Sequence, residues 1–100
     1  MANFRVGERR KILISFDEAI GENISLTSVA EARERNGVAT VVSASVISGR
    51  ISVGDETFYP GRAVLLTMDF ERAGVGDLGV LVETNDGQRV GFSRKFSVSP

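Results

Sequence analysis

The chain has 100 residues, enough for one domain with one hydrophobic core. It contains no cysteine and no histidine, which excludes disulfides and thiolate chemistry and removes the commonest general base and transition-metal ligand. The net charge is -1, so no overall field draws the protein to nucleic acid. We therefore expect a protein that is not an enzyme, carries no cofactor and has other proteins, not nucleic acid, as partners.

No stretch of the sequence is apolar and long enough to cross a bilayer, and the N-terminus lacks the apolar core of a secretory signal. These features predict a protein with no membrane partner that is synthesised in the cytoplasm. A mature chain from which a signal had been removed would give the same pattern.

The sequence is predicted to divide into an arm and a domain, with the boundary between residues 10 and 11. Residues 1–10 are predicted to form an N-terminal arm, and residues 11–100 a single β-sandwich domain. Apolar residues alternate from Lys11 to Phe16, which predicts the first strand. Turn-forming and acidic residues follow, and alternation then resumes in a short strand at Ile24 and Leu26.

The segment from Thr27 to Gly37 is the one stretch with helical character. Ser28 and Glu31 have the spacing of a capping box, and Asn36 with Gly37 supplies a left-handed stop. A helix of about two turns is too short to be stable unless it is packed. The segment is therefore predicted either as a short helix near residues 28–36 or as an irregular loop between strands.

β-Branched residues return after this segment. The stretch from Val38 to Ile47 is apolar on both faces, which predicts a central strand. Two short strands follow at Ile51–Val53 and Thr57–Tyr59, and Pro60-Gly61 then breaks the chain. Alternation from Arg62 to Phe70 predicts a further strand.

The last residues are predicted to form a β-hairpin. Strands at Leu78–Glu83 and Gln88–Val98 flank Thr84–Gly87, and Asn-Asp-Gly between alternating segments is a strong turn signal. Arg94 is the one residue out of pattern on the inward face of the final strand, among Val90, Phe92, Phe96 and Val98.

About seven short strands with regularly spaced turns predict an all-β fold, specifically an immunoglobulin-like antiparallel β-sandwich. A small barrel is the alternative architecture. Because the sequence has no internal repeat and no linker, one module is expected.

Gly74–Gly79 matches the G-x-G-x-x-G string of dinucleotide-binding proteins. In those proteins the glycines open a helix, whereas Val80–Glu83 is strand-like here and the chain ends too soon for a βαβ unit. The string is therefore predicted to form a glycine-rich turn between adjacent strands.

Two groups of carboxylates could supply oxygen ligands for calcium at an end of the sandwich. No EF-hand spacing occurs, and loop carboxylates are usually solvated, so we predict no metal site and no catalytic residues. The two groups are Asp17, Glu18 and Glu22, and Asp55, Glu56 and Asp77.

Two short segments supply candidate protein-interface residues. The basic N-terminal cluster either docks on an acidic neighbour or is a solvated terminus that keeps an edge strand from pairing wrongly. The aromatic pair beside Pro60 either anchors an interface or contributes one ring to the core. The candidates are Phe4, Arg5, Arg9, Arg10, Phe58 and Tyr59.

Four segments in the second half of the chain resemble one known family: Ser45–Ile51, Arg62–Phe70, Gly76–Gly79 and Val82–Arg89. The family is that of the small immunoglobulin-like virion proteins of tailed phages, of the fibre-tail adaptor type. Its pattern has a turn closing on Gly-Arg before the final strand, whereas here a glutamine separates the two residues.

The segment at 27–37 looks like an insertion relative to that family. The resemblance carries over only two positions, Gly76 and Gly79, as structural glycines of a turn. It implies a non-enzymatic structural or assembly protein of a phage virion, either a neck or tail adaptor or a capsid decoration protein. Such a protein is synthesised in the host cytoplasm, resides in the virion, and assembles with other virion proteins or as a symmetric homo-oligomer.

Two other function classes remain open at the level of the sequence. A soluble carbohydrate- or ligand-binding β-module is the main alternative, but the chain has no tryptophan and only one tyrosine on which a sugar could stack. A small enzyme would need a carboxylate or lysine mechanism, and no residue stands out as its catalytic group.

Overall fold

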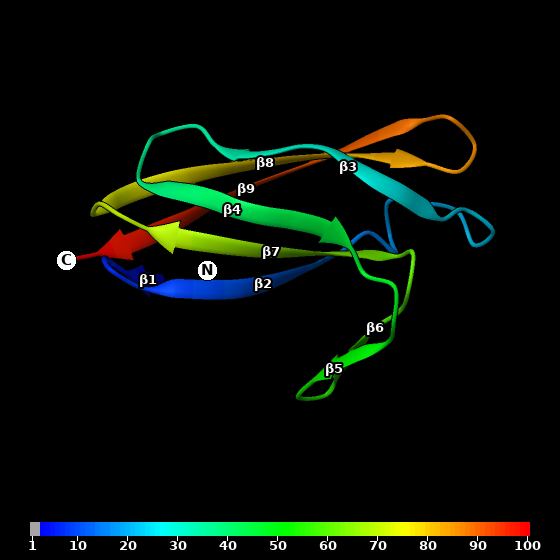
Figure 1. The fold of residues 1–100 in the computed structure, drawn as a ribbon, viewed down its shortest axis with the longest axis horizontal. Helices are drawn as coiled ribbons and strands as arrows, with labels where there is room; N and C mark the ends of the chain where they lie inside the picture. The colour runs from blue at the N-terminus through cyan, green and yellow to red at the C-terminus, as the bar shows by residue number, and fades with distance from the viewer. Residues whose placement is uncertain (1–2) are drawn as a thin grey trace.

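The computed structural model describes residues 3–100, which form nine β-strands and no helix (Figure 1). The all-β prediction is confirmed. The strands pair as a sheet of order β1-β9-β8-β3, a sheet of order β2-β7-β4, and a separate β5–β6 hairpin. Their bounds are β1 Asn3–Arg5, β2 Arg9–Ser15, β3 Leu26–Glu34, β4 Ala39–Val46, β5 Ile51–Val53, β6 Glu56–Phe58, β7 Ala63–Phe70, β8 Gly74–Thr84 and β9 Arg89–Ser99.

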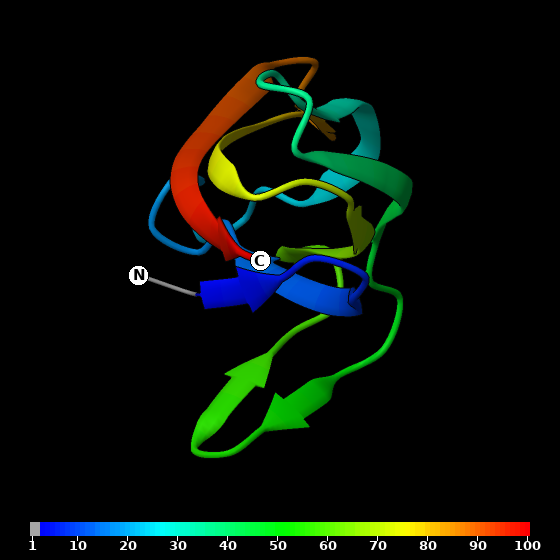
Figure 2. The same ribbon diagram turned by 90° about the vertical axis from the view of Figure 1, so that its left-hand side faces the viewer.

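The two larger sheets lie face to face around one core, an arrangement that fits a β-sandwich (Figure 1, Figure 2). β7 is the middle strand of its sheet, and its inward residues are at most 1% exposed: Val64, Leu66, Met68 and Phe70. β8 and β9 face them with Leu78, Val80, Val82, Phe96 and Val98, all buried. The alternation of apolar residues therefore predicted the inward faces of these strands correctly.

Residues 27–37 form neither a helix nor an irregular loop, because most of the segment belongs to β3 and pairs with β8. The register shifts between Leu26 and Ser28 and again between Val29 and Glu31. Each shift adds a residue to one strand, so the inward residues Leu26, Val29 and Ala32 are three apart rather than two. The prediction was wrong because it relied on local helix signals, Ser28 with Glu31 and Asn36 with Gly37, and the bulged pairing with β8 outweighs them.

β4 is an edge strand and not the predicted central strand, since within residues 3–100 it pairs only with β7. A register shift between Val41 and Ser43 interrupts its alternation, and Val42 is 47% exposed. Apolar residues occur on both faces of β4 because of this irregularity, not because both faces are covered.

The segment predicted as an N-terminal arm contributes to both sheets. β1 pairs with β9, and a turn at residues 6–8 then leads into β2 of the opposite sheet. Gly7 N–H donates to the carbonyl of Phe70 at 2.7 Å, which fixes the turn. Residues 3–10 are thus built into the fold, while residues 1 and 2 lie outside the described residues.

The sandwich is not wholly antiparallel as predicted. β1 and β9 pair in parallel, with Phe4 opposite Val98, whereas every other strand pair in the described part of the chain is antiparallel. β1 runs alongside the end of β9 toward one end of the sandwich, where the turn at residues 6–8 reverses the chain into β2 of the opposite sheet.

The glycine string at 74–79 lies inside β8 and is not a turn. A Cβ on Gly76 would overlap the ring of Phe96, which lies opposite it in register. A Cβ on Gly79 would overlap the guanidinium of Arg35. These two glycines keep a strand surface free for larger side chains, which is a structural role in a strand instead of the expected turn.

Candidate interaction site

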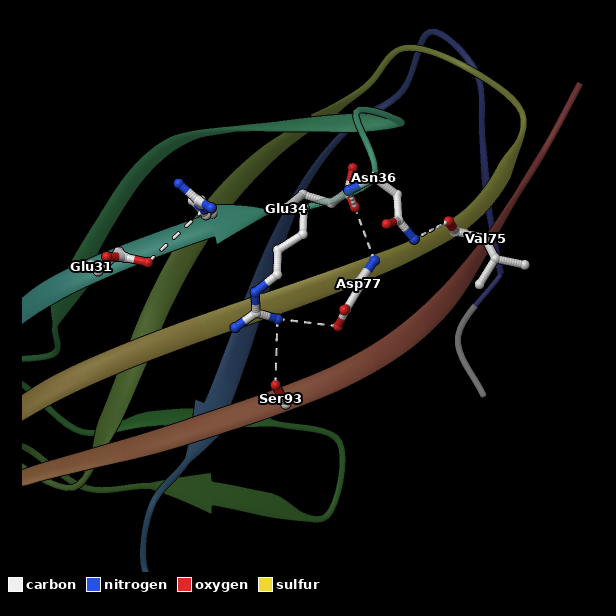
Figure 3. Close-up of polar contacts among 8 residues, drawn as sticks. Glu31, Glu34, Asn36, Val75, Asp77 and Ser93 are labelled. Atoms are coloured by element: carbon white, nitrogen blue, oxygen red, sulfur yellow. Dashed lines mark hydrogen bonds and ion pairs between the residues drawn. The ribbon is translucent and has the colours of Figure 1, made fainter.

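The two lateral sides of the sandwich differ, and the loop between β3 and β4 closes one of them. Glu34, at the end of β3, accepts hydrogen bonds from the backbone N–H groups of Asn36 and Val38, each at 2.6 Å. It also accepts from the N–H of Asp77 in β8 at 2.9 Å (Figure 3), and from the N–H of Ala39 at 3.1 Å. One carboxylate therefore ties the loop to a strand of each large sheet.

Side chains next to Glu34 add to this closure. The amide nitrogen of Asn36 donates to the carbonyl of Val75 at 3.0 Å, and Arg35 Nη1 lies 3.2 Å from Asp77 Oδ1 (Figure 3). Burial alone would raise the pKa of Glu34, but the four backbone hydrogen bonds outweigh it and hold that pKa below its ordinary value.

The opposite side, between β2 and β9, is open. Among residues 3–100 no strand pairing joins β2 to β9, and β9 pairs with β1 only from Ser97 to Ser99. A cleft of about 340 Å³ lies along this side. Its lining includes four consecutive residues of β2, 12–15, which is possible only at a strand edge because successive side chains point to opposite faces. We call this site the β2–β9 cleft.

Five phenylalanines line the β2–β9 cleft, and three of them pack against one another as its floor. The rings of Phe4 and Phe70 are stacked, with centroids 4.2 Å apart and planes 8° apart. Phe96 meets both rings edge-on, with centroids at 5.8 Å from Phe4 and 5.7 Å from Phe70. The floor is therefore a rigid aromatic surface that holds the two sheets together where no backbone ladder does.

Arginines stand at the rim of the cleft on both edge strands. Arg94 of β9 lines the cleft with its guanidinium 5.5 Å from the ring centroid of Phe92. Arg10 of β2 lies 5.8 Å from the centroid of Phe4 and 3.3 Å from Glu8. Within the described residues Arg94 has no carboxylate at ion-pair distance. It is a positive charge held over apolar surface.

The β5–β6 hairpin projects from the body of the sandwich (Figure 1, Figure 2). It adjoins the β2–β9 cleft, because Glu56 and Phe58 of β6 belong to the cleft lining. Its base is anchored by Phe58, which is 8% exposed and packs with Ile47 and Ala63. Its tip is exposed: Val53 is 58% exposed, and Asp55 and Glu56 are exposed acidic residues. Glu56 also lines the β2–β9 cleft, so the hairpin tip and the cleft are neighbouring surfaces.

The six residues predicted as interface residues divide into three groups. Phe4 and Phe58 are buried and line the β2–β9 cleft from within, so they are not free surface anchors. Arg10 lies at the rim of the same cleft. The remaining three are exposed and lie outside its lining: Arg5, Arg9 and Tyr59, the last 49% exposed.

Arg9 points away from the cleft and forms a two-point contact with Asp69, with N–O distances of 2.6 and 2.9 Å. This hydrogen bond lowers the pKa of Asp69 below its usual value. Sequence reasoning missed Val53 and considered Glu56 only as an oxygen ligand for calcium, but it had a signal for Arg94, the one charged residue on an apolar face.

Comparison with protein-family models and with curated proteins found no match to this chain. Residues 3–100 contain no group of three acidic side chains placed to hold a metal ion, and Asp17 and Asp77 are paired with Arg62 and Arg35. None of the described residues forms a helix that could span a membrane.

Proposed function

We propose that this chain is a non-enzymatic structural or assembly protein of a phage virion. It is a neck or tail adaptor or a capsid decoration protein, with an immunoglobulin-like sandwich, synthesised in the host cytoplasm. It acts through contacts with other virion proteins and with further copies of itself. The observation that carries the proposal is the pairing of an open, arginine-rimmed apolar cleft with a projecting hairpin whose tip exposes Val53.

Both features suit docking. Specific protein interfaces have an apolar centre and a polar rim, in which arginine is enriched. The β2–β9 cleft has an aromatic floor, with Arg94 and Glu56 at its edge. Unpaired strand edges and exposed apolar side chains are normally kept small in proteins that act alone, so their position side by side favours a protein that is covered in an assembly.

The test is a particle-binding experiment together with a mass measurement. The purified chain is mixed with virions, or with purified tails and capsids, of the phage whose genome encodes it, and bound protein is measured after sedimentation. We expect saturable binding or a defined oligomer by light scattering. A strict monomer with no affinity for any virion part would overturn the proposal.

A soluble ligand-binding module is the alternative function, and the cleft volume favours it. About 340 Å³ is near the lower limit of small-molecule sites. The cleft floor is aromatic but largely buried, and Tyr59, the one tyrosine, lies outside the lining. A small apolar anion therefore fits better than a sugar, and binding of a glycan on an array would be the result that favours the carbohydrate form of this alternative.

A further inference from the structure

We propose that the β5–β6 hairpin of one copy of this chain docks on the β2–β9 cleft of a second copy, with its carboxylates facing Arg94. This inference rests on the proposed assembly function and names one partner and one contact for it. The hairpin tip, defined as residues 52–56, is the ligand, and the partner copy provides the complementary cleft.

The cleft offers two kinds of contact to a hairpin. Ile12 and Leu13 are only partly buried and continue the apolar floor out to the rim. The free edge of β2 also presents backbone groups for which no partner strand exists in the described part of the chain. β5, which within residues 3–100 pairs only with β6 and carries the exposed Val53, would satisfy both, because strand addition supplies backbone hydrogen bonds and a pocket takes the side chain.

The charges at the cleft call for an acidic occupant. Arg94 projects from the inward face of β9 over Phe92, and the ion pairs of the described residues leave it without a carboxylate. Lys11 and Lys95 lie outside the cleft lining and on the outer faces of their strands, so Arg94 is the one positive charge among the lining residues that the structure describes. A guanidinium over an apolar floor binds a carboxylate more strongly than one in open water, since the surroundings screen the charge less.

The hairpin tip carries the matching groups. Val53 is the most exposed of the large hydrophobic residues in the described chain, at 58%, and it pairs across the hairpin with Glu56. Asp55 lies between them at the turn, so one valine and two carboxylates share the tip. Arg94 over an apolar floor on one surface and an acidic, apolar tip on the other are complementary in charge and in apolar character.

The hairpin tip and the cleft are also placed so that two copies can make the same contact with each other. Glu56 lines the cleft of its own chain, so the hairpin and the cleft adjoin one another. When a ligand surface and its receptor surface are contiguous, a two-fold axis can satisfy both contacts in one interface. Each copy then covers the open side of the other with its hairpin.

A charge-exchange experiment tests the contact. One variant carries Arg94→Glu, which makes the cleft acidic, and the other carries Asp55→Lys with Glu56→Lys, which makes the hairpin basic. We expect the natural chain to form dimers by light scattering, and each variant alone to lose dimer affinity by about tenfold or more, because like charges then meet. An equimolar mixture of the two variants restores the dimer, since both contacts are again between opposite charges.

Matched controls change equal charges elsewhere. Arg33→Glu alters an exposed β3 residue on the closed side, and Glu18→Lys with Glu22→Lys alters an exposed loop. Both controls should dimerise as the natural chain does. Thermal melting of every variant verifies folding, so loss of dimer cannot be mistaken for loss of the domain.

Three results would overturn the inference. These are a natural chain that is monomeric at its highest soluble concentration, a dimer that survives both variants, and folded variants whose mixture stays monomeric. In each case particle binding, measured separately, still decides the proposed virion function. Failure of this contact and failure of that function are thus distinguishable.

Discussion

At the scale of single residues, Glu34 makes four of the hydrogen bonds that hold the closed side of the sandwich together. Its carboxylate accepts four backbone N–H groups, and no neutral side chain of similar size can do the same. In Glu34→Gln one carboxamide atom is an NH2 group, which faces N–H donors instead of accepting from them. We expect the free energy of unfolding at neutral pH to fall by about 2 kcal/mol, measured by urea denaturation.

The same residue makes stability depend on pH in a defined direction. Because the pKa of Glu34 is lower in the folded protein than in the unfolded chain, its contribution is complete above the unfolded pKa. The contribution is lost as the pH falls through the folded pKa. The difference in unfolding free energy between the natural chain and Glu34→Gln should therefore shrink as the pH is lowered below about 4. A difference that stays constant from neutral to acid pH would contradict this explanation.

A further prediction for single residues concerns the space that Gly76 leaves in the core. Its missing side chain gives space to the ring of Phe96, which belongs to the aromatic floor. Gly76→Ala should therefore lower the free energy of unfolding by about 1 to 3 kcal/mol through overpacking. Gly91 of β9 is the control, because a Cβ there meets no atom within 4 Å and Gly91→Ala should be close to neutral. Equal melting temperatures for the two variants would refute the packing argument.

Sequence reasoning reached some of these residues and not others. Arg94 breaks an apolar pattern and could be noticed without coordinates. The role of Glu34 depends on the N–H of Asp77, which is 43 positions away and is brought near only by the β3–β8 pairing. Gly76 is likewise required only because the ring of Phe96, on another strand, occupies the space that a Cβ would fill. Contacts between strands that are distant in the chain leave no local signal in the sequence.

At the scale of elements, strands with uninterrupted alternation were predictable and irregular ones were not. β7 and β9 have regular inward faces, and their predicted positions hold within a few residues. β3 contains two register shifts and was mistaken for a helix or loop, and β4 contains one and was placed centrally. A shift changes which face a residue occupies, and the sequence does not mark where the partner strand requires it.

The hairpin at 51–58 has a prediction of its own. A two-stranded hairpin is marginal in water, so this one depends on the packing of Phe58 beneath it. Phe58→Ala should lower the free energy of unfolding by about 3 kcal/mol and speed hydrogen exchange in β5 and β6. Tyr59→Ala removes a neighbouring ring that is 49% exposed and should change either quantity little. Unchanged exchange in the Phe58 variant would mean that the hairpin is held by other contacts.

At the scale of the whole molecule, the sandwich is held differently on its two sides. The closed side has the β3–β4 loop with its hydrogen bonds to Glu34, whereas the open side relies on Phe4, Phe70 and Phe96. Composition and turn spacing could predict a sandwich of short strands, since both follow from local patterns. They could not predict this asymmetry, because it depends on which edges meet.

Phe4 is the residue through which the open side can be weakened. It comes from the three-residue strand β1 and stacks on Phe70, so the start of the chain joins the two sheets there. Phe4→Ala should lower the free energy of unfolding by about 3 kcal/mol and raise the binding of a hydrophobic dye to the native protein, as the aromatic floor is uncovered. Val6→Ala, at a side chain 42% exposed two positions later, is the matched control and should do neither. If Phe4→Ala melted like the control, the N-terminal segment would be a dispensable arm, as the sequence alone suggested, and the two sheets would be held together without it.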